Sequence, residues 1–382
     1  MSTRPAPSHA DLRDAVRAFA EAVLRPQAAS VDQGHRFPEE ALKEAARLDL
    51  MGILVPPEYG GAGLDHVAFA VCIEELARAC ASTAVIIDVH NSVATEPVLI
   101  FGTEEQKRAW LPRLARGEVI GAFALTEPGS GSDAAALTTT ATRRGGSYVL
   151  EGTKSFITNA GHAGLYIVFA RTGQEPRAAG VSAFLVPGEA AGLKVGQIYR
   201  KMGLNGSATG EVVLDGVTVP AEAMLAPEGC GFQVAMRALD SGRIGISAQA
   251  LGIAAAALEE ALRFTSEREQ FGRPVATFQG VGFTLADMAT KLEAARLMTH
   301  HAASLCSAGR PFTMEASMAK LFTTDAAMEI AIDAVQLAGD YGYVSDNPFE
   351  RHLRDVKATQ IYEGSNQIQR VVIARHLLAG AR

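Results

Sequence analysis

Cysteine is scarce in this chain, with Cys72, Cys80, Cys230 and Cys306 the only examples among 382 residues. Four cysteines are too few for a disulfide framework, and none forms the C-x-x-C pair that is typical of structural zinc. The nine histidines contain no H-E-x-x-H motif. We therefore expect neither a disulfide-stapled scaffold nor a metal site.

Positive charge, aromatic residues and long apolar runs are also in short supply. Lys and Arg total 35 against 42 Asp and Glu, and aromatic residues make up only 6% of the chain. An acidic protein without a basic run lacks the surface that nucleic-acid binding requires. No run of about 20 consecutive apolar residues is present, so we expect no membrane insertion. The N-terminal sequence MSTRPAPSHADLRDAV has no apolar signal core, and its Asp11 and Asp14 are unlike a transit peptide. We predict a soluble, cytoplasmic protein.

The hydrophobic pattern divides the chain into three blocks. Apolar residues recur at helical spacing up to residue ~120, short β-branched runs separated by turn residues follow, and the helical period returns after residue ~230. A chain of this length fits two or three domains. We predict an α+β protein with an N-terminal α-helical domain (1–120), a middle β-barrel or sandwich-like domain (121–230) and a C-terminal four-helix-bundle domain (231–382).

Local signals add detail to these blocks. Thr103 with Gln106 predicts a helix capping box, and Arg144-Gly145-Gly146 predicts a hairpin turn. The segments 147–152 and 152–160 each have the pattern of a short strand. The Ala/Leu-rich segments 239–265 and 313–338 contain no proline and predict long helices.

The segment ALTEPGSGSD (124–133) is rich in glycine and hydroxyl groups. Residues 129–134 match the G-x-G-x-x-A form of a dinucleotide-binding turn, but that motif must be followed by a helix. Because the next segment, TTTATR, is typical of a strand, we reject a Rossmann fold. The loop can still grip a ring edge or a phosphate with its N–H and O–H groups. Judged alone, it is better explained as a plain turn.

The segment IYEGSNQIQR (361–370) places a carboxylate in a break between two helical patterns. We expect Asn366 and Gln369 to restart the helix as a capping box. Glu363 then lies in a tight loop beside Tyr362, where a bound ligand can cover it and raise its pKa into the range of a general base. Taken by itself, the segment is better explained by a solvated loop acid.

Together, seven segments in order along the whole chain resemble one family, the acyl-CoA dehydrogenases. They are ALTEPGSGSD, GTKSFITNA, RKMGLNGSATGEVVLDGVTVP, SGRIGISAQALGIA, REQFGRP, QLAGDYGY and IYEGSNQIQR. The segments LDSGRIGISAQALGIA and MAKLFTTDAA resemble the short-chain, butyryl-CoA branch most. The resemblance implies an FAD flavoprotein of fatty-acid β-oxidation, a homotetramer built as a dimer of dimers, and an electron-transfer flavoprotein as electron acceptor.

The resemblance also implies a mechanism and a catalytic residue. A base removes the Cα proton of an acyl-CoA thioester while the Cβ hydride passes to flavin N5, which yields the trans-2-enoyl-CoA. Glu363 matches the base in the family's Y-E-G-[TS] loop. Some relatives carry the base directly before the arginine that is Arg243 here, but that position is Gly242, so Glu363 is the only candidate.

The remaining site residues are implied by their positions in the matching motifs. Arg268, Phe271, Gln279 and the 336–340 loop match residues that reach the FAD of a neighbouring subunit. The full set of implied FAD contacts is Phe123, Leu125, Thr126, Ser132, Phe156, Ile157, Thr158, Arg268, Phe271, Gln279, Gln336, Gly339, Asp340, Ser365 and Gln367. The implied acyl-CoA contacts are Ser132, Asp240, Arg243, Gly364 and Arg375.

Three residues depart from the family pattern. Phe156 replaces a tryptophan on the flavin face, Asp340 replaces the second glycine of a G-G pair near the FAD phosphates, and Ser365 replaces a threonine. Alternative functions on the same fold are an acyl-carrier-protein dehydrogenase or an acyl-CoA oxidase of a biosynthetic pathway. A non-catalytic flavin-binding protein is a more distant alternative.

Overall fold

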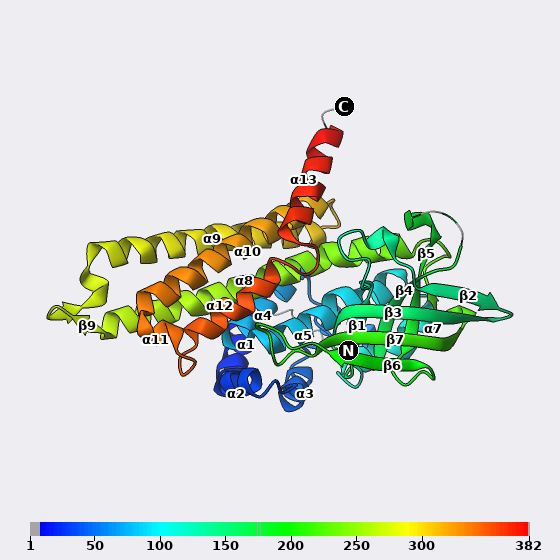
Figure 1. Cartoon of the computed structure of the whole chain (residues 1–382), viewed down its shortest axis with the longest axis horizontal. Coiled ribbons are helices and arrows are strands. Elements are labelled where there is room, and N and C mark those ends of the chain that lie inside the picture. The colour runs from blue at the N-terminus through cyan, green and yellow to red at the C-terminus, as the bar shows by residue number, and fades with distance from the viewer. Residues whose placement is uncertain (1–7, 174, 176, 381–382) are drawn as a thin grey trace.

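The structure is a computed structural model that describes residues 8–173, 175 and 177–380. Residues 1–7 belong to the N-terminal segment in which we expect no signal peptide, and they lie outside the described residues. A helical layer, a β domain and a long helical bundle follow one another along the chain (Figure 1). This order confirms the predicted α–β–α fold class.

The N-terminal region is helical, with a core that continues into the rest of the molecule. Its elements are α1 (His9–Phe19), η1 (Ala20–Leu24, a π-helix), η2 (Arg25–Gln27), α2 (Ala28–Gln33), α3 (Glu39–Arg47), η3 (Pro57–Tyr59), α4 (His66–Ala79), α5 (Ala81–Val89), η4 (His90–Thr95, a π-helix), α6 (Glu96–Phe101) and α7 (Glu104–Ala115). Every residue from Ala81 to Val98 is buried. The stretch is mostly apolar, and its polar residues, among them Asp88, His90 and Asn91, are buried with it.

Two polar contacts hold parts of this helical region in place. The capping box at Thr103 and Gln106 is present at the start of α7, as the sequence predicts. His90 is fully buried in η4, where its Nε2 lies 2.9 Å from the Met51 carbonyl oxygen and its Nδ1 accepts a hydrogen bond of 3.0 Å from the Gly121 N–H. Burial lowers the pKa of His90 to about 4. A neutral imidazole thus ties the helical region to the first strand.

The middle region forms an eight-stranded sheet. Its strands are β1 (Gly121–Ala124), β2 (Thr140–Arg144), β3 (Ser147–Thr158), β4 (Leu165–Arg171), β5 (Val181–Pro187), β6 (Leu193–Ile198), β7 (Thr209–Pro220) and β8 (Met224–Leu225). The short helical turns η5 (Ala134–Ala136), η6 (Arg177–Gly180) and η7 (Ala221–Ala223) connect them. The strand order is β6-β7-β3-β2-β4-β5-β8, with β1 added parallel to β4.

The sheet confirms two local predictions and corrects a third. The turn at Gly145 joins β2 and β3 as an antiparallel hairpin, and the strand β2 follows the glycine-rich loop in place of the helix that a Rossmann fold needs. The two strands predicted around residue 152 are wrong, because β3 runs unbroken from Ser147 to Thr158. Gly152, with φ of 153°, absorbs an irregularity in the register against β7, so the strand bends where we expected it to end.

The C-terminal region is a bundle built around one 37-residue helix. Its elements are α8 (Gly231–Glu267), β9 (Glu269–Gln270), β10 (Arg273–Pro274), η8 (Val275–Thr277), α9 (Gln279–Ser307), α10 (Thr313–Ala338), α11 (Asp340–Tyr343), α12 (Phe349–Thr359) and α13 (Asn366–Gly380). The long helices α8 and α10 confirm the two predicted from the proline-free segments. In Figure 1 the β9 hairpin lies at one end of the molecule and the sheet at the other.

Two helical stretches reach the length and mean apolar composition of a membrane span, although neither is an unbroken run of apolar residues. They are Ala81–Phe101 and Gly231–Glu267, and 83% and 89% of their most apolar windows are buried inside the protein. Their apolar surface is therefore used in the protein core.

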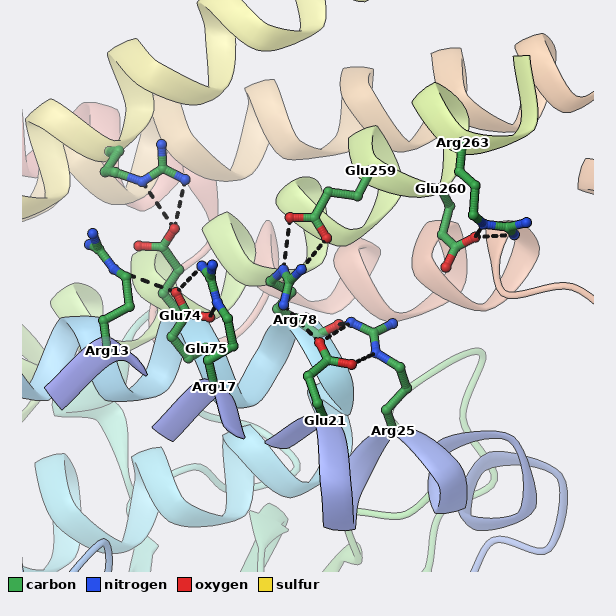
Figure 2. A network of polar contacts seen from close by, with 11 residues as sticks. Arg13, Arg17, Glu21, Arg25, Glu74, Glu75, Arg78, Glu259, Glu260 and Arg263 are labelled. Atoms are coloured by element: carbon green, nitrogen blue, oxygen red, sulfur yellow. Dashed lines mark hydrogen bonds and ion pairs between the residues drawn. The ribbon is translucent and has the colours of Figure 1, made fainter. Parts of the chain in front are cut away.

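Charged side chains join the N-terminal helices to one another and to the bundle (Figure 2). Arg17 donates two hydrogen bonds of 2.8 Å to the buried carboxylate of Glu75. Arg78 bridges Glu21 of η1 and Glu259 of α8. Bidentate pairs of this kind fix the relative position of helices more than they stabilise the fold.

Candidate active site

Glu363 lies in the tight loop that joins α12 to α13. Its φ of 52° and the φ of 90° at Gly364 put two successive residues in the left-handed region, which is strained for a glutamate. The loop is held from α10, since the buried Lys320 Nζ donates hydrogen bonds of 2.9 Å to the Gly364 carbonyl and to Asn366 Oδ1. Gln369 Nε2 donates a further bond of 2.8 Å to the Gly364 carbonyl. These hydrogen bonds therefore stabilise a strained loop backbone that fixes the direction of the Glu363 side chain.

The Glu363 carboxyl group points at α8, where a glycine makes room for it. A Cβ atom added at Gly242 would lie 2.0 Å from Glu363 Oε2 and 2.9 Å from Val93 Cγ1. Oε2 itself is buried and has no hydrogen-bond partner among the described residues, although the residue as a whole is partly exposed. Gly242 cannot act as a base itself. Because it has no side chain, the Glu363 carboxyl group can occupy the space beside α8.

The surroundings of Glu363 extend the pH range in which its carboxyl group stays protonated. Burial raises the pKa of Glu363 to about 7, and the positive charges of Lys320 and Arg243 only partly oppose this. Burial likewise lowers the pKa of Lys320 to about 7. A carboxyl group whose pKa lies near neutrality is suited to accept a proton and release it again.

The capping box predicted at Asn366 and Gln369 is wrong. The helix α13 does begin at Asn366, but the Asn366 Nδ2 donates to Thr324 Oγ1 at 2.9 Å and to Asp325 Oδ1 at 2.7 Å. The Gln369 N–H is instead bonded to the Ser365 carbonyl. Both side chains serve the Glu363 loop and α10, because buried polar partners outcompete the local cap.

Arg243 and Asp240 form a buried pair, one residue after and two residues before Gly242. Arg243 Nη1 donates a hydrogen bond of 2.6 Å to Asp240 Oδ1, and Thr313 Oγ1 donates one of 2.6 Å to Asp240 Oδ2. Both residues are buried. The pair links α8 to the start of α10 beside the proposed base, where the resemblance places the CoA channel.

On the β side, the two segments predicted to contact flavin lie next to each other. The Ser155 N–H donates a hydrogen bond of 2.8 Å to the Thr126 carbonyl, so the end of β1 and the end of β3 are joined. Leu125 and Ile157 are buried, while Thr126 and Thr158 are partly exposed. Beneath them, Lys154 Nζ pairs with Glu127 Oε1 at 2.8 Å.

Phe156 is the exposed aromatic residue of this edge. It is 65% exposed, its φ of 58° is in the left-handed region, and its ring stacks on Tyr199 with centroids 4.6 Å apart. Tyr199 also lines an open cavity of about 590 Å³ that extends to Phe37 and His162. A large apolar ring held outward at a strained position is typical of a surface that a ligand covers.

The segment η4 connects the β edge to the Glu363 loop. A Cβ at Gly121 of β1 would lie 2.5 Å from Ala94 of η4, and Val93 of the same segment contacts Gly242. Phe123 of β1, half-buried, packs against the same apolar cluster as Val93 and Tyr362. The structure therefore brings the strand predicted to contact flavin and the predicted base to two sides of one π-helical turn, a feature often found at functional sites.

The residues at this edge have the chemistry to hold FAD. The glycine-rich loop is open, since a Cβ at Gly129 or Gly131 would meet nothing within 4 Å. Ser132 presents an exposed hydroxyl group, and Thr126 and Thr158 add partly exposed ones. An exposed aromatic ring, free hydroxyl groups and accessible main chain fit a flat, hydrogen-bonding ring system.

The other predicted FAD residues lie elsewhere. Arg268, Phe271 and Gln279 are in or beside the β9 hairpin, and Gln336, Gly339 and Asp340 lie at the α10–α11 junction, all exposed (Figure 1). These two sets adjoin each other, with the Arg268 guanidinium 5.5 Å from the Tyr341 ring centroid. Gly339 is the C-cap of α10. Within one chain, this end and the sheet are at opposite ends of the molecule.

The last predicted residues surround Glu363 or lie beyond it. Ser365 and Gly364 are partly exposed beside Glu363, and Gln367 is exposed on the first turn of α13. Arg375 is exposed further along α13, which projects from the bundle (Figure 1). The structure therefore groups Gly364, Ser365, Asp240 and Arg243 with Glu363, and it places Arg375 on the exposed surface of α13.

Sequence reasoning missed the side chains that support this loop. Lys320, Gln369 and Asp88 were not among the candidates, and the Glu127–Lys154 pair was not recognised. A lysine in an apolar helical run such as MAKLFTT is a signal that could have identified Lys320, because an uncompensated lysine is rarely buried. Asp88 gives a similar signal inside the apolar run AVIIDV.

Comparison with known proteins identifies the fold's relatives. Three family models match the chain: the acyl-CoA dehydrogenase N-terminal domain over residues 6–118, the middle domain over 122–217 and the C-terminal domain over 229–378. The chain belongs to the acyl-CoA dehydrogenase family. It is an FAD-dependent oxidoreductase that dehydrogenates acyl-CoA thioesters.

Relatives and solved structures cover nearly the whole chain. It is 51% identical to an acyl-CoA dehydrogenase of Bacillus subtilis, over 97% of each protein. It is 48% identical to the mitochondrial short-chain specific acyl-CoA dehydrogenase of Bos taurus, over 98% of this chain and 91% of that protein. A chain in a solved structure of the electron transferring flavoprotein of Acidaminococcus fermentans superimposes with a TM-score of 0.96 and 44% identity, over 99% of this chain and 100% of that one.

Proposed function

We propose that Glu363 is the catalytic base and that the substrate is a short-chain acyl-CoA. The observation that carries this is the position of Glu363: a carboxylate on a strained loop, with a buried and unpartnered Oε2 among the described residues. Its pKa near 7 lets it be ionised before substrate binds and neutral after proton transfer. FAD, when bound, supplies the two-electron acceptor for the hydrogen that leaves Cβ.

The residues around Glu363 have distinct tasks in this proposal. The Glu363 main-chain N–H polarises the thioester carbonyl and stabilises the enolate-like charge that forms as the Cα proton leaves. Lys320 fixes the loop through its bonds to Gly364 and Asn366. The Asp240–Arg243 pair lines the CoA channel, and Phe156 forms the outer wall of the flavin edge.

The Glu363→Gln variant tests the base. The amide is nearly isosteric, so fold, FAD content and acyl-CoA binding should persist, whereas proton abstraction is lost. We expect anaerobic flavin bleaching by butyryl-CoA to slow by at least about 10²–10⁴-fold. The surface change Glu329→Gln, which removes only an exposed pair with Lys291, is the matched control. Bleaching by Glu363→Gln within tenfold of the wild-type rate would show that another group is the base.

The short-chain preference is supported by the similarity to short-chain specific relatives. A steady-state screen from C4 to C16 and branched acyl-CoAs tests it, and best turnover with C12 or longer would contradict it. Comparing turnover of butyryl-CoA with turnover of a butyryl-carrier protein tests the alternative that the enzyme is a carrier-protein dehydrogenase. An oxidase is separated by comparing dioxygen with an electron-transfer flavoprotein as acceptor.

We also propose a homotetramer that passes electrons to an electron-transfer flavoprotein in the cytoplasm. In one chain the β9 hairpin and the α10–α11 junction lie far from the flavin edge, so the FAD contacts predicted there belong to a neighbouring copy. The similarity to the chain from the flavoprotein structure supports the acceptor. Light scattering that shows an FAD-loaded monomer near 40.2 kDa would contradict the assembly.

A further inference from the structure

Asp88 is a second buried carboxyl group beside the proposed base. It is fully buried at the end of α5, directly before η4. A Cβ added at Gly245 would lie 1.9 Å from Asp88 Oδ1, just as one at Gly242 would lie 2.0 Å from Glu363 Oε2. Positions i and i+3 share a helix face with Cβ atoms about 5–6 Å apart. The two carboxyl groups therefore pack into adjacent glycine gaps on one strip of α8.

Among the described residues, Asp88 has fewer hydrogen-bond donors around it than a buried, ionised carboxylate needs. Ser92 Oγ lies 2.8 Å from the Asp88 main-chain carbonyl oxygen and 2.9 Å from Asp88 Oδ1. The Ser92 hydroxyl donates its single hydrogen to both oxygens, so Asp88 Oδ1 receives only a shared hydrogen bond. Asp88 Oδ2 is buried and has no hydrogen-bond partner within the described part of the chain. An ionised carboxylate would leave that oxygen without the bonds it needs.

The charged groups around the pair compensate one negative charge on the Glu363 side. Lys320 of α10 and Arg243 of α8 face Glu363, and they oppose the rise in its pKa. Asp88 is faced by Glu363, by the Tyr362 ring and by Ser92. Burial, followed by the negative charge of Glu363, raises the pKa of Asp88 well above its ordinary value. Tyr362 is also neutral, because burial raises its pKa and both carboxyl groups add to this.

We propose that Asp88 is a positioning residue that holds a proton while Glu363 ionises, so that the pair carries a single negative charge and that charge is on the base. This inference rests on Glu363 being the base. When Asp88 ionises at higher pH, a second negative charge faces the strip where enolate-like charge develops, and the reaction slows. The pair then titrates in two steps, of which only the first activates the enzyme.

The Asp88→Asn variant of the holoenzyme tests this through the pH profile of anaerobic flavin bleaching by butyryl-CoA. The wild-type rate should rise and then fall as pH increases, and the variant should keep the rise but lose the fall. Each rate is divided by the same protein's rate at its optimum pH. At pH values where wild-type Asp88 is ionised, this ratio should be about tenfold higher in the variant than in wild type. Superimposable profiles from about pH 6 to pH 10 would overturn the proposal.

Thermal unfolding gives a readout that does not depend on activity. A group whose pKa is raised by folding destabilises the protein progressively as pH rises above the ordinary carboxyl range. Asp88→Asn should therefore raise the melting temperature more at pH 8 than at pH 5. The gain should shrink in a Glu363→Gln background, because the charge that raises the Asp88 pKa is gone. Equal gains at both pH values, in both backgrounds, would contradict a proton on Asp88.

Asp355→Asn is the matched control. Asp355 is buried on α12, it accepts the Leu204 N–H at 2.6 Å, and burial raises its pKa to about 7. It should show the same pH-dependent gain in melting temperature with no change in the bleaching profile. If Asp88→Asn fails to fold, Asp88→Ser is the second variant, with FAD absorbance as the check on folding. If Glu363→Gln loses all bleaching and Asp88→Asn has no effect, Glu363 remains the proposed base and the role proposed for Asp88 is wrong.

Discussion

Two buried carboxylate–lysine neighbourhoods show how the same residue types acquire opposite properties. In the sheet, Lys154 donates directly to Glu127 at 2.8 Å. Burial alone would raise the pKa of Glu127, but the charge of Lys154 and hydrogen bonds from Thr139 and Thr138 lower it to about 2. Near α10, Lys320 donates to the Gly364 carbonyl and Asn366, and the pKa of Glu363 rises to about 7. The direction of the lysine donors decides whether the carboxylate is structural or reactive.

The largest effect should come from breaking the structural pair. Glu127 also accepts hydrogen bonds of 2.6 Å from the Thr138 N–H and 2.9 Å from the Thr139 N–H, so Glu127→Gln leaves Lys154 without its counter-charge. We expect the free energy of unfolding in urea to fall by about 3–5 kcal/mol. Since folding lowers this pKa, the pair stabilises above the ordinary carboxyl range, and its contribution is lost as pH falls toward 2.

The same substitution at Glu363 supplies the contrast. Glu363→Gln removes a group whose pKa is raised by burial, so the free energy of unfolding should be nearly unchanged at pH 5 and should increase relative to wild type as pH rises through 7. If Glu363→Gln were the more destabilising of the two, the division into structural and reactive carboxylates would be wrong.

A smaller effect, on chemistry alone, is expected from filling the gap in α8. In Gly242→Ala the new Cβ would lie 2.0 Å from Glu363 Oε2, and the flexible carboxylate must move by more than an ångström. We expect flavin bleaching to slow about 10²-fold while the fold persists. Gly146→Ala, where a Cβ meets nothing within 4 Å, is the control. An unchanged rate in Gly242→Ala would mean that the base does not work from this position.

The fold was predictable from the sequence to the extent that its signals are local or periodic. Helical and alternating periods gave the three blocks, and the Thr103 capping box and the hairpin at Gly145 followed from short-range hydrogen bonding. The bend at Gly152 and the role of Asn366 depend on partners in β7 and α10, so local patterns misassigned both.

The candidate site was predictable only through its motifs. Glu363 could be assigned because the loop around it is distinctive, and Gly242 because of its neighbour Arg243. Lys320 and Asp88 are single charged residues in apolar helices, and nothing in the sequence shows that α5, α8 and α10 bring them to one loop. The distances across that interface had to come from the structure.

The smallest predicted effect concerns Lys320, which holds the Glu363 loop from α10. In Lys320→Met the positive charge that opposes the rise in the Glu363 pKa is removed, so the base should ionise at higher pH. We expect the half-rise of the bleaching rate to move up by about one pH unit, and the rate below it to fall by up to about tenfold. Lys291→Met, which removes an exposed lysine from α9, should leave the profile unchanged. A downward shift in Lys320→Met would contradict the electrostatic role of Lys320.

The most direct test of Glu363 as a tuned base is the pH dependence of the second-order rate constant for anaerobic flavin reduction by butyryl-CoA. This constant reports ionisations of the free enzyme. Since only the ionised carboxylate accepts a proton, the constant should rise with pH and reach half its maximum near pH 7. A profile that is already flat above about pH 5, as for an ordinary solvated glutamate, would contradict the assignment.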